Sequence, residues 1–254
     1  MLKAERQDTI VSLVDQLGTA SVAEIAQELH VSEMTVRRDL EDLSQAHRLM
    51  RVHGGAFSLH KPTAITLDHE YSNDEKHQRN MEAKRQVAQA AAALVQDGET
   101  VFVGTGTTGE ELACLLAAKH VRLVTNSLPI FELVKDVPFL DPYLVGGAYR
   151  KRTGAFVGPM AERMVSMVGV TRAFIGANGI YDGMVSTANT DEGNLQRLVL
   201  GRSAHRYVIA DASKVGQRDF FDFYALKDLD ALITDASLSP TNRKLLERHA
   251  KVIV

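Results

Sequence analysis

The sequence predicts an α/β protein with two domains: a small N-terminal domain of three helices and a β hairpin, and a larger C-terminal α/β domain. Residues 10–43 place apolar side chains at helical spacing, and the run that ends at Phe57 alternates apolar and polar side chains. From Gly98 onward, short apolar runs alternate with helical stretches, which is typical of a mainly parallel sheet covered on both faces. Residues 58–74, with Pro62 and mixed polar side chains, predict a linker between the two parts.

Length and composition fit two globular domains. The chain has 254 residues, of which 45% are hydrophobic and 24% are charged, as in an ordinary globular protein. We expect a first domain at residues 1–57, a linker at 58–74 and a second domain at 75–254. No apolar run is long enough to span a membrane, and the start of the chain lacks the apolar core of a secretory signal, so we expect a cytoplasmic protein. Cys114 is the only cysteine, which excludes an intrachain disulfide, and its apolar neighbours predict a buried thiol.

Three helices and a β wing are expected in the first domain. Each helix has an apolar face: Ile10, Leu13, Val14 and Leu17 in the first, Ile25, Ala26 and Leu29 in the second, and Val36, Leu40 and Leu43 in the third. Ser32 is a good N-cap for the third helix. The segment LMRVHGGAF then alternates apolar and polar side chains around a Gly pair, which predicts the wing. Together these elements predict a winged helix-turn-helix.

The third helix carries the candidate DNA contacts, because this helix enters the major groove in three-helix DNA-binding domains. Once its apolar face is buried, the side chains expected to lie away from the core are those of Thr35, Arg38, Asp39 and Asp42, with Arg37 beside them. Either arginine can bind a guanine through two hydrogen bonds. Ser32 and Thr35, in the first turn, can reach phosphates or base edges. On the wing, Arg51 and His53 are placed to contact the DNA backbone or the minor groove.

Charge alone does not distinguish DNA binding from a solvated helix surface. Residues 1–57 carry six Lys and Arg against nine Asp and Glu, so the domain is not basic. The alternative is that Arg37 pairs with Glu41 and Arg38 with Asp42, four residues apart, as on many exposed helices. The charges leave both interpretations open.

The second domain has a candidate phosphate site directly after its first strand. The run TVFVG leads into Thr105, Gly106, Thr107 and Thr108, and a helical stretch follows. A Gly- and Thr-rich turn at a helix N-terminus offers free N–H groups, hydroxyls and a positive dipole end. The lysine of a nucleotide-binding P-loop is missing. A plain strand-to-helix turn is the alternative.

Polar side chains also follow other expected strands. Asn126 and Ser127 lie in one such loop, Asn178 in another, and Asp211 and Lys214 in a third. Because ligands of open α/β sheets bind outside the carboxyl ends of the strands, these side chains are candidates for binding a sugar hydroxyl or a phosphate. Ordinary loop capping and a surface ion pair between Asp211 and Lys214 are the alternatives. Lys84 at the start of the domain is expected on a solvated helix face, although it could assist phosphate binding.

These motifs, taken together, resemble the DeoR family of bacterial transcriptional regulators over nearly the whole chain. The blocks that match are TVRRDL followed by RVHGGA, then GTGTTGEELA, VTNSLP, VGGAYRKRTGAFVGP, AFIGANGI and ADASKVG. The resemblance implies that Thr35, Arg37 and Arg38 lie on a recognition helix, and that Asp39 packs the helix or orients an arginine. It also implies a sensor domain similar in fold to ribose-5-phosphate isomerase and glucosamine-6-phosphate deaminase, with Gly106, Thr107 and Thr108 as a phosphate cradle and Lys214 as a phosphate or sugar ligand.

The function implied by the resemblance is that of a repressor of a carbohydrate-utilisation operon. Such a protein binds double-stranded operator DNA as a homo-oligomer, and a phosphorylated sugar relieves the repression. Within the family, the chain is most similar to repressors of lactose and tagatose-6-phosphate pathways. It departs from the family where Gly104-Thr105-Gly106 stands in place of a pattern such as DAGTT, which removes one acidic group that could bind a sugar hydroxyl.

An enzyme is the main alternative, namely a sugar-phosphate isomerase fused to a DNA-binding module. Isomerisation requires a general base near a substrate carbon. Where the similar isomerases have a carboxylate-rich stretch, this chain has Asn178, which leaves Asp211 and Glu192 as possible bases. No cofactor is expected, and the nine scattered histidines predict no metal site.

Overall fold

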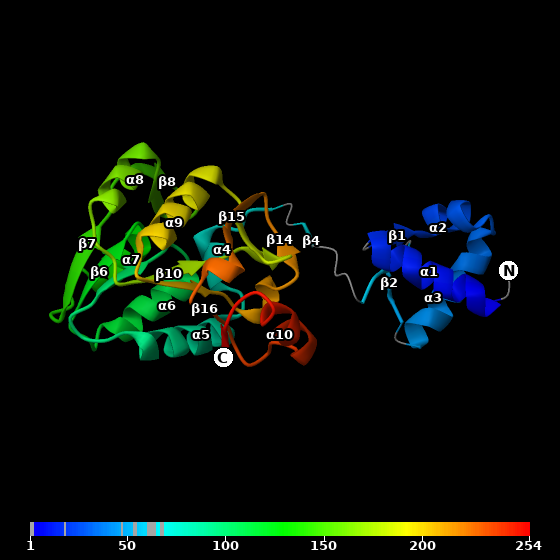
Figure 1. Cartoon of the computed structure of the whole chain (residues 1–254). Coiled ribbons are helices and arrows are strands. Elements are labelled where there is room, and N and C mark those ends of the chain that lie inside the picture. Colours follow the sequence, from blue (N-terminus) through cyan, green and yellow to red (C-terminus); the bar gives the residue numbers. More distant parts are fainter. Residues whose placement is uncertain (1–2, 18, 47, 53–54, 60–64, 67–68) are drawn as a thin grey trace. The chain divides into compact units, whose positions relative to one another are not determined.

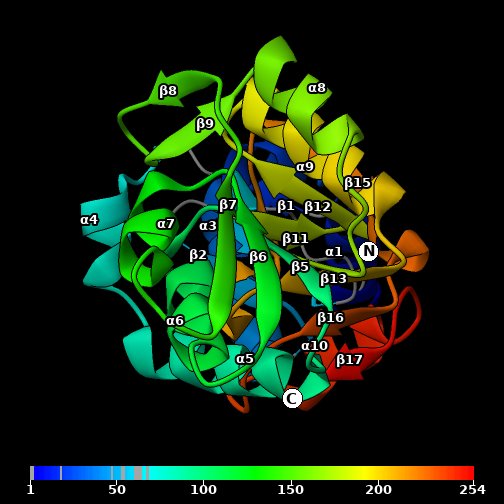
Figure 2. The same cartoon turned by 90° about the vertical axis from the view of Figure 1, so that its left-hand side faces the viewer.

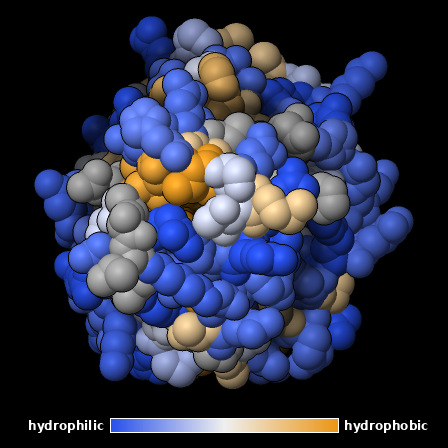
Figure 3. Space-filling model, turned by 90° about the vertical axis from the view of Figure 1, so that its right-hand side faces the viewer, coloured by the Kyte–Doolittle hydropathy of each residue, from blue (hydrophilic) through white to orange (hydrophobic). Residues whose placement is uncertain are grey.

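The computed structural model describes residues 3–17, 19–46, 48–52, 55–59, 65–66 and 69–254. The chain forms two compact units, residues 1–65 and 66–254, and each is described by itself (Figure 1). None of the helices in this described part has the length and apolar character needed to cross a bilayer. The face of the N-terminal unit that is turned toward the viewer in Figure 3 is largely hydrophilic, with a small hydrophobic group among polar side chains.

The N-terminal unit is a winged helix-turn-helix. Its elements are α1 (Lys3–Leu17), β1 (Thr19–Ser21), α2 (Val22–Leu29), α3 (Glu33–Gln45), β2 (Met50–Val52) and β3 (Gly55–Phe57). The strands form an antiparallel sheet in the order β1-β3-β2. The predicted inward faces are confirmed, since Ile10, Val14, Ile25, Val36 and Leu40 are fully buried in one cluster.

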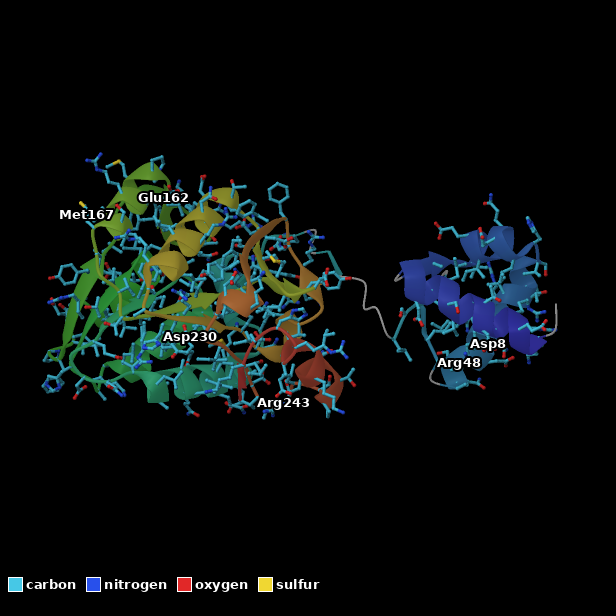
Figure 4. All side chains as sticks on the ribbon, in the orientation of Figure 1. Asp8, Arg48, Glu162, Met167, Asp230 and Arg243 are labelled. Carbon is cyan, nitrogen blue, oxygen red and sulfur yellow. The ribbon has the colours of Figure 1, made fainter. Side chains whose placement is uncertain are left out.

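Two ion pairs link the N-terminal half of α1 to the rest of this unit. Asp8 of α1 forms an ion pair with Arg48, which follows α3, at 2.8 Å, and the two side chains lie together in Figure 4. Lys3 pairs with Asp42 of α3 at 2.8 Å. Both pairs are exposed and therefore contribute little to stability. The buried apolar cluster, rather than these pairs, holds the three helices together.

The C-terminal unit is built on a seven-stranded parallel sheet, as the alternation of apolar runs predicts. In spatial order its strands are β17 (Val252–Ile253), β16 (Ala231–Ile233), β13 (His205–Ile209), β10 (Arg172–Gly176), β5 (Thr100–Val103), β6 (Val121–Thr125) and β7 (Leu140–Leu144). The chain runs outward from β5 to β7 and then returns to β10 on the other side of β5. The carboxyl ends of β5 and β10 are therefore the point where the winding reverses, which is where open α/β sheets bind ligands.

Helices cover both faces of this sheet. Figure 2 shows α5 (Met81–Leu94), α6 (Thr107–Leu116) and α7 (Leu128–Val134) on one side of the strands and α8 (Pro159–Ser166) and α9 (Thr190–Arg202) on the other. Successive residues of β10 alternate between these two layers: Phe174 packs in the cluster with α5 and α6, whereas Ala173 and Ile175 pack in the cluster with α8 and α9. A strand buried on both faces has no polar side, which explains its continuous apolar run.

Smaller elements accompany the seven-stranded sheet. They are β4 (Ile65–Thr66) at the junction of the units, α4 (Asn73–His77), the hairpin β8 (Ala148–Arg150) and β9 (Ala155–Val157), the antiparallel sheet β11 (Gly179–Tyr181), β12 (Met184–Thr187) and β15 (Phe221–Ala225), the strand β14 (Gln217–Arg218), the 3-10 turns η1 (Ala212–Lys214) and η2 (Leu226–Asp228), and α10 (Pro240–Leu246).

Cys114 corrects one expectation. The thiol was expected to be buried, but Cys114 is exposed on α6. The apolar run around it has more apolar positions than one helix face can bury: Leu112, Ala113 and Leu116 face the core, whereas Leu115 is 39% exposed.

Candidate functional site

The first turn of α3 is closed by its own side chains. The Ser32 hydroxyl caps the helix by accepting a hydrogen bond from the Thr35 N–H at 3.2 Å, and the two hydroxyl oxygens lie 2.9 Å apart. Ser32 is exposed and Thr35 is partly exposed. Both hydroxyls are therefore at the surface, at the helix end that favours an anion such as a DNA phosphate.

The two arginines of α3 differ in how they are held. Arg37 donates to Glu33 at 3.2 Å, one turn earlier in the helix. Arg38 is exposed and makes no hydrogen bond or ion pair with any residue that the structure describes. The suggested pairs of Arg37 with Glu41 and of Arg38 with Asp42 are therefore wrong. Arg38 is the cation of this helix that is free to bind an external anion or base.

Asp39 was expected on the outward face of α3, but the structure buries it. It is 1% exposed, and Arg6 of α1 binds its carboxylate with Nε and Nη2, at 2.5 and 3.3 Å. Gln7 donates to the same carboxylate at 3.3 Å. Burial is compatible with a charged Asp39 because an arginine and an amide satisfy its oxygens. Asp39 packs α3 against α1, one of the two roles that the family resemblance allowed.

The wing places Arg51 next to α3. Arg51 lies on β2, is exposed, and forms an ion pair with Glu41 of α3. An exposed pair of this kind exchanges readily for a phosphate contact, because it contributes little in water. His53 lies outside the described residues.

In the C-terminal unit, the predicted phosphate loop lies at the point where the sheet reverses its winding. Gly106 precedes α6 with a φ of +119°, a conformation that favours glycine, and a Cβ there would meet open space. Gly109 brings the helix against the loop, because a Cβ on it would lie 2.5 Å from the Gly104 carbonyl oxygen. Thr105 donates its hydroxyl to the Thr153 carbonyl at 3.1 Å.

The N-terminus of α6 has the chemistry of an anion site. Glu110 donates its N–H to Gly106 at 3.1 Å, so the N–H groups before it precede the first helical hydrogen bond. Thr107 and Thr108 are buried, and among the described residues neither hydroxyl has a hydrogen-bond partner. Backbone donors, two hydroxyls and a helix dipole therefore meet at one point.

Asn126 and Ser127 fix the neighbouring loop after β6. The Asn126 amide donates to the Phe156 carbonyl at 3.1 Å, and the Ser127 hydroxyl caps α7 by accepting from Ile130 at 3.3 Å. Both residues are buried. The structure thus shows them holding the β9 hairpin strand and α7 in place.

Three lysines gather at the same edge of the sheet. Lys84 of α5 is 5% exposed, which overturns the expectation of a solvated helix face. Burial lowers the pKa of Lys84 to about 8, an effect opposed by Asp211 and reinforced by Lys214 and Lys76. Burial likewise lowers the pKa of Lys76, Glu192 opposes that shift, and Lys214 adds to it. Lys76, Lys84 and Lys214 are therefore close enough to repel one another.

Residues 69–80, here called the strap, cross the carboxyl edge of the sheet just before α5. Asn73 donates to Glu110 at 2.8 Å, Lys76 donates to Asn178 at 3.2 Å, and Asn80 donates to Asp211 at 3.1 Å. These partners come from α6 and from the loops after β10 and β13. The buried ammonium of Lys84 donates to the Lys76 carbonyl, at the end of α4. The strap is therefore held by the same loops that carry the candidate ligand residues.

Carboxylates near the three lysines offset their positive charge. Asp219 accepts from the Asn178 amide at 2.8 Å and is 7% exposed. Glu192 accepts from Thr153 and lies 3.0 Å from Arg150, which also donates to Glu70 at 2.5 Å. The described residues contain no group of three or more His, Cys, Asp or Glu placed to hold a metal ion. The site is thus a network of ammonium, amide and carboxylate groups suited to a polar anionic ligand.

Sequence reasoning missed Lys76, Asp219, Glu70 and Arg150 in this network. Lys76 comes from the five-residue helix α4, Arg150 from the β8–β9 hairpin, and Glu70 and Asp219 from irregular segments, so no apolar periodicity marks them. For Arg150 the block AYRKRTGAF did provide a signal, namely three consecutive cations.

A winged helix-turn-helix joined to an α/β domain with such a site defines a ligand-responsive transcription regulator. The chain belongs to the DeoR family: residues 6–62 match the DeoR-like helix-turn-helix domain, and residues 79–236 match the DeoR C terminal sensor domain.

Relatives with curated names resemble the chain over its whole length. The lactose phosphotransferase system repressor of Staphylococcus epidermidis is 37% identical, and that of Streptococcus mutans is 38% identical, each over 100% of both chains. The protein of the same name from Staphylococcus aureus is 39% identical over 92% of this chain and 93% of its own.

Among solved structures, the likenesses are partial. Ribose 5-phosphate isomerase A from Methanocaldococcus jannaschii matches with a TM-score of 0.40 and 19% identity, over 54% of this chain and 55% of that chain. The isomerase from Neisseria gonorrhoeae matches with a TM-score of 0.40 and 21% identity, over 59% and 57%.

The comparisons favour a regulator over an isomerase. The relatives are named repressors, and the chain carries the family's helix-turn-helix domain. The two carboxylates left as possible bases are both engaged: Asp211 accepts from Asn80 and Ser213, and Glu192 faces Thr153 and Arg150.

Proposed function

We propose that the protein is a cytoplasmic repressor of a carbohydrate-utilisation operon and that a phosphorylated sugar relieves its repression. The observation that carries this proposal is the convergence of Lys76, Lys84 and Lys214 at the sheet edge that also holds the N-terminus of α6. Clustered ammonium groups with free N–H groups and hydroxyls favour a phosphate.

The phosphate would be bound by Thr105, Gly106, Thr107 and Thr108 with Lys214. Asn178 and Asp211 would bind sugar hydroxyls, because an amide and a carboxylate together donate and accept. Asn126 and Ser127, in the loop after β6, would contact the same ligand. The Asn73 Oδ1 is buried without a donor in the described part of the chain, and a sugar hydroxyl would satisfy it.

The names of the relatives reduce the number of candidate effectors. Each is named a repressor of the lactose phosphotransferase system. The first effectors to test are therefore the phosphorylated sugars of lactose use, tagatose-6-phosphate among them.

Operator DNA would be bound by α3 and the wing. Arg38 would bind a guanine, with Arg37 and Thr35 beside it and Ser32 at a phosphate. Arg51 and His53 would contact the DNA backbone or the minor groove from the wing. A homo-oligomer would set the spacing of two such units on a two-fold symmetric operator.

The strap couples the two functions in this proposal. It follows the segment that joins the two units, and Lys76 and Asn80 within it bond to Asn178 and Asp211. A sugar phosphate bound to these residues would change the contacts of the strap. The DNA-binding units of an oligomer would then lose the spacing that the operator requires.

The test is a thermal-shift measurement on the full chain with hexose-6-phosphates and their unphosphorylated parents. A hundredfold excess over the Kd adds about 2.7 kcal/mol to the unfolding free energy. We expect a shift with one sugar phosphate and none with its parent. Lys214→Ala should abolish that shift, whereas Lys227→Ala, an exposed lysine of η2, should keep it. The absence of a shift with every phosphorylated sugar would rule out a sugar-phosphate effector and leave the DNA-binding assignment standing.

A further inference from the structure

One large apolar side chain lies on the surface of the recognition helix. Met34, the second residue of α3, is 67% exposed. Single exposed apolar residues are common and need no explanation by themselves. The position of Met34 among its neighbours, rather than its exposure, is what distinguishes it.

Met34 shares one face of α3 with Arg37, Arg38 and Glu41. Residues three, four and seven positions apart lie on the same side of a helix. Arg37 is held by Glu33, and Glu41 pairs with Arg51 of the wing. In the described residues of this helix face, only Met34 and Arg38 have neither a hydrogen bond nor an ion pair with another part of the chain.

The N-terminal end of a recognition helix is the part that contacts base edges. The one apolar feature that the major groove presents is the C5 methyl group of thymine. A methionine has no charge or strong donor to give a phosphate, but its flexible thioether chain packs well against a methyl group.

We propose that Met34 reads a thymine methyl group in each operator half-site, next to the base pair contacted by Arg38. This inference rests on the proposed role of α3 as the recognition helix. Because the two side chains lie one helical turn apart, with about 5–6 Å between their Cβ atoms, the thymine lies within two base pairs of that contact.

Replacing thymine by deoxyuridine removes the methyl group and nothing else, which makes a direct test. The probe is a duplex selected from a random library by the full-length protein, with deoxyuridine substituted at one thymine at a time. We expect one thymine per half-site where the substitution weakens wild-type binding about fourfold, the equivalent of about 0.8 kcal/mol for one buried methyl-sized group.

Variants assign that methyl contact to a residue. Met34→Ala should bind the thymine and deoxyuridine duplexes nearly equally at this position, while Met34→Leu, which keeps apolar bulk, should retain most of the discrimination. Met167→Ala is the matched control, because Met167 is 73% exposed on the other unit, at the end of α8 (Figure 4). It should show the wild-type pattern.

Two results would overturn the inference: no thymine at which the methyl group matters, or the same sensitive thymine in Met34→Ala. Neither touches the proposed role of α3 in DNA binding, which fails separately if Arg38→Ala binds the selected duplex as tightly as the wild-type chain does.

Discussion

Lys84 carries a buried ammonium group, and the free-energy cost of burying this charge depends on pH. Its pKa is lowered from the ordinary 10.5 to about 8, mainly by burial. Because the folded-state pKa is below the unfolded one, the unfolded chain holds more protons between these two values. Stability therefore rises with pH across that window. A bound phosphate would raise the pKa of Lys84 again, because it favours the charged form of the lysine.

Lys84→Met removes that titration. Between about pH 7.5 and about pH 9.5, we expect the unfolding free energy of the wild-type chain to rise by about 1–2 kcal/mol more than that of the variant. Urea unfolding at the two pH values measures the difference. Equal changes in both proteins would contradict a lowered pKa at Lys84.

Asp39 contributes to the fold of the N-terminal unit through a buried contact. Asp39→Ala leaves Arg6 facing a buried surface without its carboxylate partner, a situation that is costly inside proteins. We expect the melting temperature of this unit to fall by roughly 10 °C. The control is Asp42→Ala, which removes the exposed contacts with Lys3 and Gln7 and should change the melting temperature by less than about 3 °C. Similar melting-temperature shifts in the two variants would show that the buried Arg6 contact contributes no more to stability than the exposed contacts of Asp42.

At the scale of elements, the strap depends on bonds to its neighbours for its stability. Its helix α4 has five residues, Asn73–His77, too few to be stable alone. Its own capping box at Ser72 and Glu75 helps: the Glu75 carboxylate accepts a hydrogen bond from the Ser72 N–H, and this bond together with the Ser72 side chain lowers the pKa of Glu75 to about 2. The remaining stability comes from bonds to neighbouring loops, so these bonds set how often the strap opens.

Asn73→Ala tests that dependence. The change removes the bond to Glu110, and we expect amide exchange in α4 to accelerate about three- to tenfold while exchange in β5 and β10 stays unchanged. Hydrogen exchange followed by mass spectrometry resolves the two regions. Asp74→Ala, an exposed neighbour on the same helix, should leave the rates as they are. Faster exchange throughout the sheet would indicate global destabilisation instead.

The sequence predicts regular elements better than it predicts this network. Periodicity located α3 and the buried strand β10, because each is specified by its own apolar spacing. The loop at Thr107 and Thr108 was located because a strand, a glycine and a helix start are local signals. Lys76 and Asp219 were missed because only the winding of the sheet brings them together with Asn178. Asp39 was misplaced because its partner Arg6 is distant in sequence.

For the whole molecule, the proposed mechanism requires that the effector and the operator DNA lower each other's binding affinity by the same factor. If the sugar phosphate weakens operator binding, operator DNA must weaken sugar-phosphate binding by an equal factor, typically about 5–150-fold. Titrating the effector by calorimetry with and without a saturating operator duplex measures this factor. Equal effector affinity in both conditions would rule out the mechanism and leave both binding sites standing.

The strap also determines where this protein can be cut for engineering. A biosensor with a new specificity is made by exchanging sensor domains between regulators, and the boundary of the matched sensor family, residue 79, is an obvious junction. A graft joined there would take Lys76 and Asn73 from one parent and their partners Asn178 and Glu110 from the other. A junction placed before His69 keeps donor and acceptor from a single parent. Under the proposed mechanism, the segment to be transferred therefore begins before residue 79, where the sensor-family match starts.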